Sequence, residues 1–135
     1  MTIQTVAIGG DHGEDFDIVG IGSIVFRATD MVEAVRINGT HHGDVQGKET
    51  VVLNLQKDEY INHLVVYESY DKKKKETRIR GVELATNLGR SIKAGTRKGP
   101  KVELKGIRVL GLGGNAGHML FNCAYITSPT MWKPQ

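Results

Sequence analysis

The chain has 135 residues, of which 39% are hydrophobic and 24% charged, with a formal net charge of +3 at pH 7 and a single cysteine, Cys123. This length suits one domain, and one cysteine excludes an internal disulfide. No apolar run approaches the roughly 18 residues that a membrane span needs, and the first residues lack a basic segment followed by an apolar one. We therefore expect a soluble protein, either cytoplasmic or exported without a cleavable signal peptide.

Short strand-like runs follow one another along the chain, many of them alternating apolar with polar residues. In chain order they are SIVFRA (23–28), VEAVRI (32–37), TVVLNL (50–55), INHLVVY (61–67), TRIRGVELAT (77–86), KVELKGIRVLGL (101–112) and MLFNCAYI (119–126). Segments rich in Gly, Asn, Asp and Lys separate them, and no window shows a helical stripe with caps. The pattern predicts an antiparallel all-β protein of ten to twelve short strands, a single domain over 1–135 with its core at about 6–127 and a C-terminal tail at 128–135.

The small net charge hides an uneven distribution. Residues 1–70 hold eleven Asp and Glu against four Lys and Arg, whereas residues 71–135 hold four against fourteen. Two basic clusters result, one at 72–80 and one at 90–105. Such clusters attract polyanions, although a solvated face or a charged hairpin tip is the commoner explanation. Nucleic acid is not expected, because no aromatic residue is interleaved with the basic ones.

Four stretches stand in an order and spacing that resemble the jacalin-related lectins: GGDHGEDFD (9–17), DEYINHLVVYESY (58–70), VELATNLGR (82–90) and GLGGNAGHMLFNCAYI (111–126). The resemblance runs from Ile8 to Ile126. It implies a β-prism I fold, in which three four-stranded antiparallel sheets are related by pseudo-threefold symmetry. It also implies a carbohydrate-binding protein for mannose- or galactose-type glycans, with glycans or glycoproteins as partners, rather than an enzyme.

The resemblance places a first sugar site at two glycine-rich loops. Its residues are Gly13 on one wall and Gly117, His118, Met119, Leu120 and Phe121 on the other. Where the family has an aspartate, this chain has Phe121, which cannot accept a hydrogen bond from a sugar hydroxyl. The site therefore lacks its expected acceptor.

A second site of the family matches TDMVE, Thr29 to Glu33, facing GDVQG, Gly43 to Gly47. Here Thr29 replaces the family's glycine, and Glu33 replaces its aspartate but keeps the carboxylate. Asp30 adds another carboxylate, so Asp30, Glu33 and Gly47 are the candidate residues of this site. A solvated turn is the alternative interpretation.

Other functions have less support. The alternative ligand is an anionic, sulfated glycan or an acidic surface, bound by Lys73, Lys74, Lys75, Arg78 and Lys98. A third possibility is an interaction domain that has lost sugar binding. Neither a cofactor nor a metal is expected, because His41 and His42 are adjacent and lack the spacing of two ligands to one ion.

Two further features complete the sequence. Asn38-Gly39-Thr40 is a glycosylation sequon that matters only in a secretory pathway. A homo-oligomer, dimer or larger, is expected because single shallow sugar sites bind weakly and several sites on one assembly bind tightly.

Overall fold

A computed structural model describes residues 4–9, 15–43, 45–73, 75–115 and 120–127. None of these residues lies in a helix. The strands are β1 (Gln4–Gly9), β2 (Asp15–Val19), β3 (Ser23–Ala28), β4 (Val32–Ile37), β5 (Thr40–Gly43), β6 (Lys48–Glu49), β7 (Leu53–Asn54), β8 (Ile61–Asp71), β9 (Glu76–Thr86), β10 (Ser91–Gly95), β11 (Lys101–Lys105), β12 (Ile107–Asn115) and β13 (Leu120–Thr127). The prediction of an all-β chain is confirmed.

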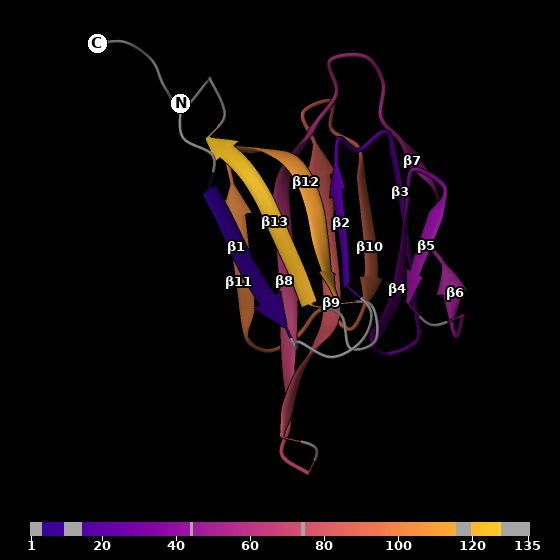
Figure 1. Cartoon of the computed structure of the whole chain (residues 1–135), viewed down its shortest axis with the longest axis vertical. Helices are drawn as coiled ribbons and strands as arrows, with labels where there is room; N and C mark the ends of the chain where they lie inside the picture. The colour runs from indigo at the N-terminus through magenta and orange to yellow at the C-terminus, as the bar shows by residue number, and fades with distance from the viewer. Residues whose placement is uncertain (1–3, 10–14, 44, 74, 116–119, 128–135) are drawn as a thin grey trace.

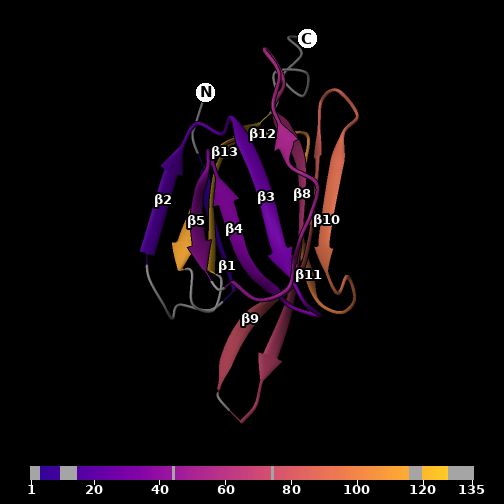
Figure 2. The same cartoon turned by 90° about the vertical axis from the view of Figure 1, so that its right-hand side faces the viewer.

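The strands form three antiparallel sheets (Figure 1). One has the order β1-β13-β12-β2, so both ends of the chain contribute to it, and a second has the order β10-β9-β8-β11. The third has the order β5-β4-β3-β6, with β7 also paired to β3. Figure 2 shows this third sheet from its own side.

The third sheet has five strands instead of the expected four, because its last strand position is divided in two. β6 pairs with β3 at Arg27 and Ala28, and β7 pairs with β3 at Ser23 and Ile24. Between them the Thr50 hydroxyl accepts the Phe26 amide at 3.1 Å and takes the place of a backbone acceptor. The continuous strand predicted over 50–55 is therefore wrong, and only Leu53–Asn54 is strand.

A shared core joins the three sheets. Strand alternation gives each sheet one apolar face, as in β10, where Ile92 and Ala94 are buried and Ser91 and Lys93 are exposed. Large buried side chains come from every sheet, with Phe26 among those that are almost fully buried. Because the three sheets pack on one core, the loops that connect their strands lie at the two ends of the molecule.

One hairpin extends past the sheets. β11 pairs with β8 only as far as Tyr67, and β10 pairs with β9 only as far as Gly81, whereas β8 and β9 stay paired to Asp71 and Glu76. The last pairs therefore form a two-stranded ribbon that projects from one end of the molecule (Figures 1 and 2). The turn-rich segment predicted after residue 67 is thus partly strand.

Asn38 closes the turn between β4 and β5 at the opposite end from that ribbon. Its φ is +52° and that of Gly39 is +84°, a pair of left-handed residues that makes a tight hairpin turn. The Asn38 side chain accepts the amides of Gly22 at 2.7 Å and Ser23 at 3.1 Å and donates to the Gly20 carbonyl at 2.9 Å. The amide nitrogen of the sequon is therefore used inside the fold.

Candidate functional site

Two of the predicted site residues lie around one hydroxyl, that of Thr29: Asp30 in the loop between β3 and β4, and Glu33 near the start of β4. Thr29 Oγ1 lies 2.8 Å from Glu33 Oε1 and 3.2 Å from Asp30 Oδ1, so its proton is donated to either carboxylate. The same oxygen accepts the Met31 amide at 3.3 Å, and the Thr29 amide donates to the Met31 carbonyl at 2.9 Å. The residue that departs from the family glycine thus holds the loop in a tight turn.

The loop after β5 lies directly against this turn at Gly47. A Cβ placed on Gly47 would lie only 2.3 Å from the Ala28 carbonyl oxygen and 2.9 Å from the Thr29 nitrogen. With φ at +85°, Gly47 also adopts the left-handed conformation that other residues rarely adopt. The structure therefore brings Gly47 together with the segment that carries Asp30 and Glu33.

Arg27, near the end of β3, fastens the loop after β5 to that strand. Its Nη1 donates to the carbonyls of Val45 at 3.1 Å and Gly47 at 2.8 Å, and its Nη2 donates to Glu49 Oε1 at 3.2 Å. Arg36 Nη2 reaches the other oxygen of Glu49 at 2.5 Å. The hydrogen bond from Arg36 is the main reason that the pKa of Glu49 lies below its ordinary value.

The second sheet supports the same loop from the other side. Thr96 Oγ1, just after β10, donates to the Asp30 carbonyl at 2.8 Å. Arg78 Nη2, on the projecting ribbon, lies 4.0 Å from Glu33 Oε2. The Glu33 side chain is 16% exposed and the Arg78 side chain 28%, so this ion pair is partly exposed to solvent. Asp30 is exposed, which leaves its carboxylate open to a ligand.

The first predicted site falls largely outside the described residues. Gly13, Gly117, His118 and Met119 are not among them. Phe121 lies in β13, where its backbone pairs with Ile8 and Gly114. Its assignment to a sugar site remains a prediction.

The predicted cationic residues lie in two segments, the β8–β9 hairpin and the loop before β11. Lys73 and Lys75 are exposed at the ribbon tip, Lys98 is exposed in the loop before β11, and Lys74 is outside the described residues. In the second basic cluster of the sequence, Arg97 pairs with Glu83 at 3.1 Å, and Lys105 pairs with Glu103 at 3.6 Å. Arg90 lies elsewhere, within a polar network.

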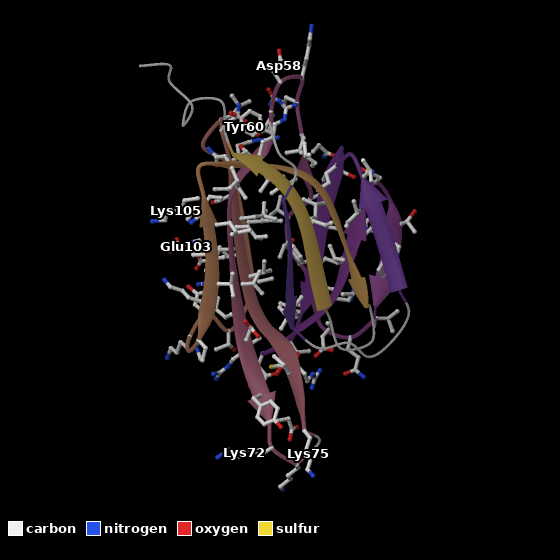
Figure 3. The ribbon with its side chains drawn as sticks, turned by 60° about the vertical axis from the view of Figure 1, so that its left-hand side comes forward. Asp58, Tyr60, Lys72, Lys75, Glu103 and Lys105 are labelled. Carbon is white, nitrogen blue, oxygen red and sulfur yellow. The ribbon has the colours of Figure 1, made fainter. Side chains whose placement is uncertain are left out.

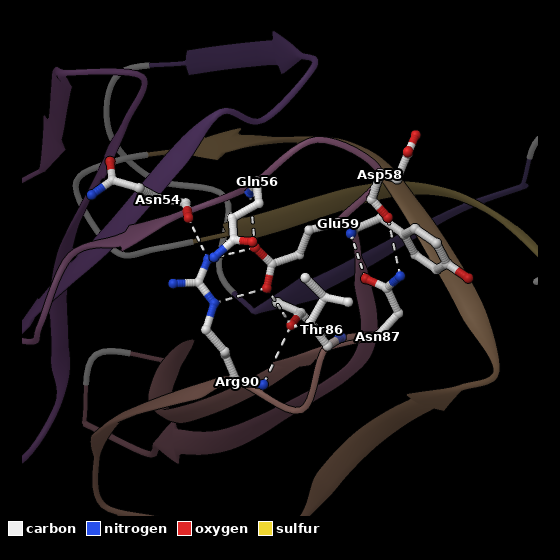
Figure 4. Close-up of polar contacts among 9 residues, drawn as sticks. Asn54, Gln56, Asp58, Glu59, Thr86, Asn87 and Arg90 are labelled. Carbon is white, nitrogen blue, oxygen red and sulfur yellow. Dashed lines mark hydrogen bonds and ion pairs between the residues drawn. The ribbon is translucent and has the colours of Figure 1, made fainter.

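That network joins two of the sequence motifs, 58–60 and 86–90 (Figure 4). The Glu59 side chain is 0% exposed, and Arg90 donates to it from Nε at 2.9 Å and also from Nη2. Thr86 Oγ1 donates to Glu59 at 2.6 Å, and the Gln56 amide donates to it at 2.8 Å. These bonds, that from Arg90 first, lower the pKa of Glu59 to about 2. Sequence analysis missed this pair, although an acid beside a strand and an arginine after Thr-Asn-x-Gly were both visible.

The network stabilises the end of the molecule opposite the ribbon. Figure 3 shows Asp58 and Tyr60 at one end and Lys72 and Lys75 at the other. A cavity of about 270 Å³ lies beside the network, and the Arg108 guanidinium carbon is 4.8 Å from the centre of the Tyr60 ring at its wall. The motif around Glu59 is thus structural, and the loops around Asp30 lie at the other end.

The described part of the chain was searched for groups that could hold a metal ion and for helices that could span a membrane. No group of three or more His, Cys, Asp or Glu side chains there is arranged to hold a metal ion. No helix there is long and apolar enough to cross a membrane.

Solved lectin structures share this architecture. Wild-type lectin from Malaysian banana superposes with a TM-score of 0.78 at 20% identity, covering 94% of this chain and 100% of that one. A mannose-binding jacalin-related lectin from Ananas comosus gives a TM-score of 0.75 at 18% identity, covering 93% and 98%. Artocarpin in its mannotriose complex gives 0.71 at 21% identity, covering 95% and 99%. A search of curated proteins by sequence found no match.

The fold is therefore a β-prism I of the kind found in jacalin-related lectins, as the sequence predicted. Residues 5–123 match the family described as the Jacalin-like lectin domain. The chain belongs to this family, whose members are carbohydrate-binding proteins and not enzymes.

Proposed function

We propose that the protein is a lectin that binds a mannose-type residue of a glycan at the loops around Asp30, Glu33 and Gly47. A neutral sugar presents adjacent hydroxyls that donate and accept hydrogen bonds, so its recognition needs a fixed acceptor and a closely placed backbone. The approach of Gly47 to the Ala28–Thr29 backbone, beside the exposed carboxylate of Asp30, is the observation that carries this proposal.

The charges around the loop define the role of each carboxylate. Glu33 uses one oxygen for Thr29 and turns the other toward Arg78, so it holds the loop in shape. The Asp30 side chain is exposed and is the acceptor for the sugar hydroxyls. The similar lectin from Ananas comosus is mannose-binding and artocarpin forms a mannotriose complex, which favours mannose over galactose as the first ligand to test.

Titration calorimetry with methyl α-mannoside and methyl α-galactoside tests the proposal. Asp30→Asn keeps the shape of the side chain and removes its charge, and a charge-assisted hydrogen bond contributes roughly 1.5 to 3 kcal/mol. We therefore expect the mannoside affinity to fall by about tenfold to a hundredfold.

Asp58→Asn is the matched control, because it makes the same change at the opposite end of the molecule (Figure 3). It should leave the mannoside affinity unchanged. If the parent protein binds neither glycoside, the proposed lectin function is refuted. If the parent and Asp30→Asn bind the mannoside equally tightly, the proposed site at Asp30 is refuted.

A further inference from the structure

The projecting ribbon stands at the same end as the proposed sugar loops. Arg78 in the ribbon faces Glu33 near the start of β4, and Thr96 after β10 bonds to Asp30 in the β3–β4 loop. The Glu68 amide donates to the Pro100 carbonyl at 2.9 Å, which fixes the base of the ribbon to the β10–β11 loop. The base of the ribbon is therefore held beside the site, and its tip projects beyond that end of the molecule, as Figures 2 and 3 show from two sides.

The cations of the ribbon tip differ from those on the sheets. Lys72, Lys73 and Lys75 are exposed, and none of them forms an ion pair with another described residue. On β11, by contrast, Lys101 and Lys105 flank Glu103 at 4.0 and 3.6 Å. Asp71, whose Oδ1 accepts the Lys73 amide at 2.9 Å, and Glu76 flank these lysines, but segment 71–76 holds four Lys against these two acids and keeps a net charge of +2. Its attraction for an anion acts over about 8 Å at physiological salt.

Arg78 connects this positive tip to the sugar loop. A guanidinium has five N–H donors, and among the described residues Arg78 makes one ion pair, from Nη2 to Glu33 at the long distance of 4.0 Å. Its remaining donors can bind the oxygens of a sulfate or carboxylate in a bidentate way. Lys98 adds an exposed cation in the β10–β11 loop, whose Thr96 bonds to the Asp30 carbonyl.

The other face of the ribbon raises a competing explanation. Tyr70 pairs with Thr77 in the register, so strand alternation places it on the opposite face from Arg78. Its side chain is 59% exposed. An exposed aromatic ring with nearby lysines also suits the surface of an anionic membrane. The pairing of Arg78 with Glu33 and the position of Lys98 in the loop whose Thr96 bonds to Asp30 favour a glycan.

From these observations we infer that the ribbon is an anion-binding arm of the lectin site. The preferred ligand is a glycan that carries a sulfate or carboxylate group on the sugar next to the residue held at Asp30. This inference rests on the proposed function, because it places the neutral residue of the ligand at that loop. It makes the ribbon the part that selects acidic glycans from neutral ones.

The test compares mannotriose with a monosulfated mannotriose by titration calorimetry at about 0.1 M and about 1 M salt, where the screening length falls from about 10 Å to about 3 Å. The parent should bind the sulfated sugar about tenfold more tightly at the lower salt. This preference should shrink at the higher salt, whereas the affinity for neutral mannotriose should not change.

Two triple variants with the same net charge show whether the preference for the sulfated sugar depends on the ribbon lysines or only on the total charge of the protein. The triple change Lys72→Gln, Lys73→Gln and Lys75→Gln should abolish the preference and keep neutral binding. The control Lys57→Gln, Lys93→Gln and Lys105→Gln removes as much charge from positions outside the ribbon and should keep both. Arg78→Gln alone should lose most of the preference.

The outcomes distinguish this inference from the proposed function. Equal affinity for the two sugars, or equal losses in the ribbon and control variants, overturns the arm and leaves the lectin site intact. If the protein binds the sulfated sugar in a salt-sensitive way and does not bind the neutral sugar at all, the site at Asp30 is wrong. The inference that one glycan spans that site and the ribbon is then wrong as well. Binding to vesicles of phosphatidylcholine with phosphatidylserine, lost in Tyr70→Ala and without glycan preference, assigns the ribbon to membranes and also overturns the inference.

Discussion

Gly47 should be the most sensitive glycine of the sugar loops. Its φ is +85°, and that of Gly39 is +84°, so Gly47→Ala and Gly39→Ala both place a side chain in the left-handed region. That conformation costs roughly 1–2 kcal/mol for an L-residue. The two positions differ in their surroundings, because a Cβ at Gly39 meets nothing within 4 Å, whereas at Gly47 it meets the Ala28 carbonyl at 2.3 Å.

The clash at Gly47 requires one backbone to move by about 1 Å, since nonbonded heavy atoms rest near 3.5 Å apart. Overpacking of this kind adds roughly 1–3 kcal/mol, so Gly47→Ala should be less stable than Gly39→Ala by that amount. The same movement separates Gly47 from the loop of Asp30, and binding sites need their groups placed within about 0.5 Å. Mannoside affinity should therefore fall in Gly47→Ala only.

Urea unfolding followed by circular dichroism measures the stability of both variants, and calorimetry on the folded proteins measures their affinity. Equal losses of stability, together with equal mannoside affinity, would show that the close approach at Gly47 has no role in shaping the site.

Two further outcomes can be checked. The Glu59 pKa is lowered to about 2 from an ordinary 4.5, so its ionised form stabilises the fold above about pH 4.5, and this contribution is lost as pH falls toward 2. Urea midpoints of the parent should drop across this range more steeply than those of Glu59→Gln, and parallel curves would contradict the role of Arg90. Phe121→Asp restores the acceptor that the family has at this position, and it should create or strengthen binding of methyl α-mannoside, measured by calorimetry in the Asp30→Asn background so that any gain belongs to the first site. A folded variant without gain would count against a sugar pocket there.

Much of the fold could be predicted because local alternation and global burial agree. The runs at 23–28 and 32–37 coincide with β3 and β4, whose apolar residues face the core. The prediction failed where tertiary contacts decide the outcome. Thr50 interrupts its strand through a hydroxyl bond to Phe26, and Val51 is 80% exposed despite its strand propensity. The run at 101–112 is two strands, because Gly106 between them has a φ of +63°.

The candidate site was only partly visible in the sequence. The resemblance to the jacalin-related lectins predicts a site at Asp30, Glu33 and Gly47, and the structure brings the segments that carry them together. The contact of Arg78 with Glu33 joins positions in different sheets and has no local signal. The same holds for Glu59 and Arg90, which are 31 positions apart and meet through a turn. Long-range polar contacts of this kind depend on how the sheets pack.

The separation between the Glu59 network and the proposed sugar loops has a consequence for engineering. The network fastens one end of the three-sheet core, whereas the loops at 29–31, 45–47 and 96–100 and the ribbon tip lie at the other. Loop tips accept insertions when few buried groups depend on them. New recognition segments could therefore be grafted at the ribbon tip, between Asp71 and Glu76, with the buried carboxylate and its arginine left in place as the anchor of a reusable scaffold.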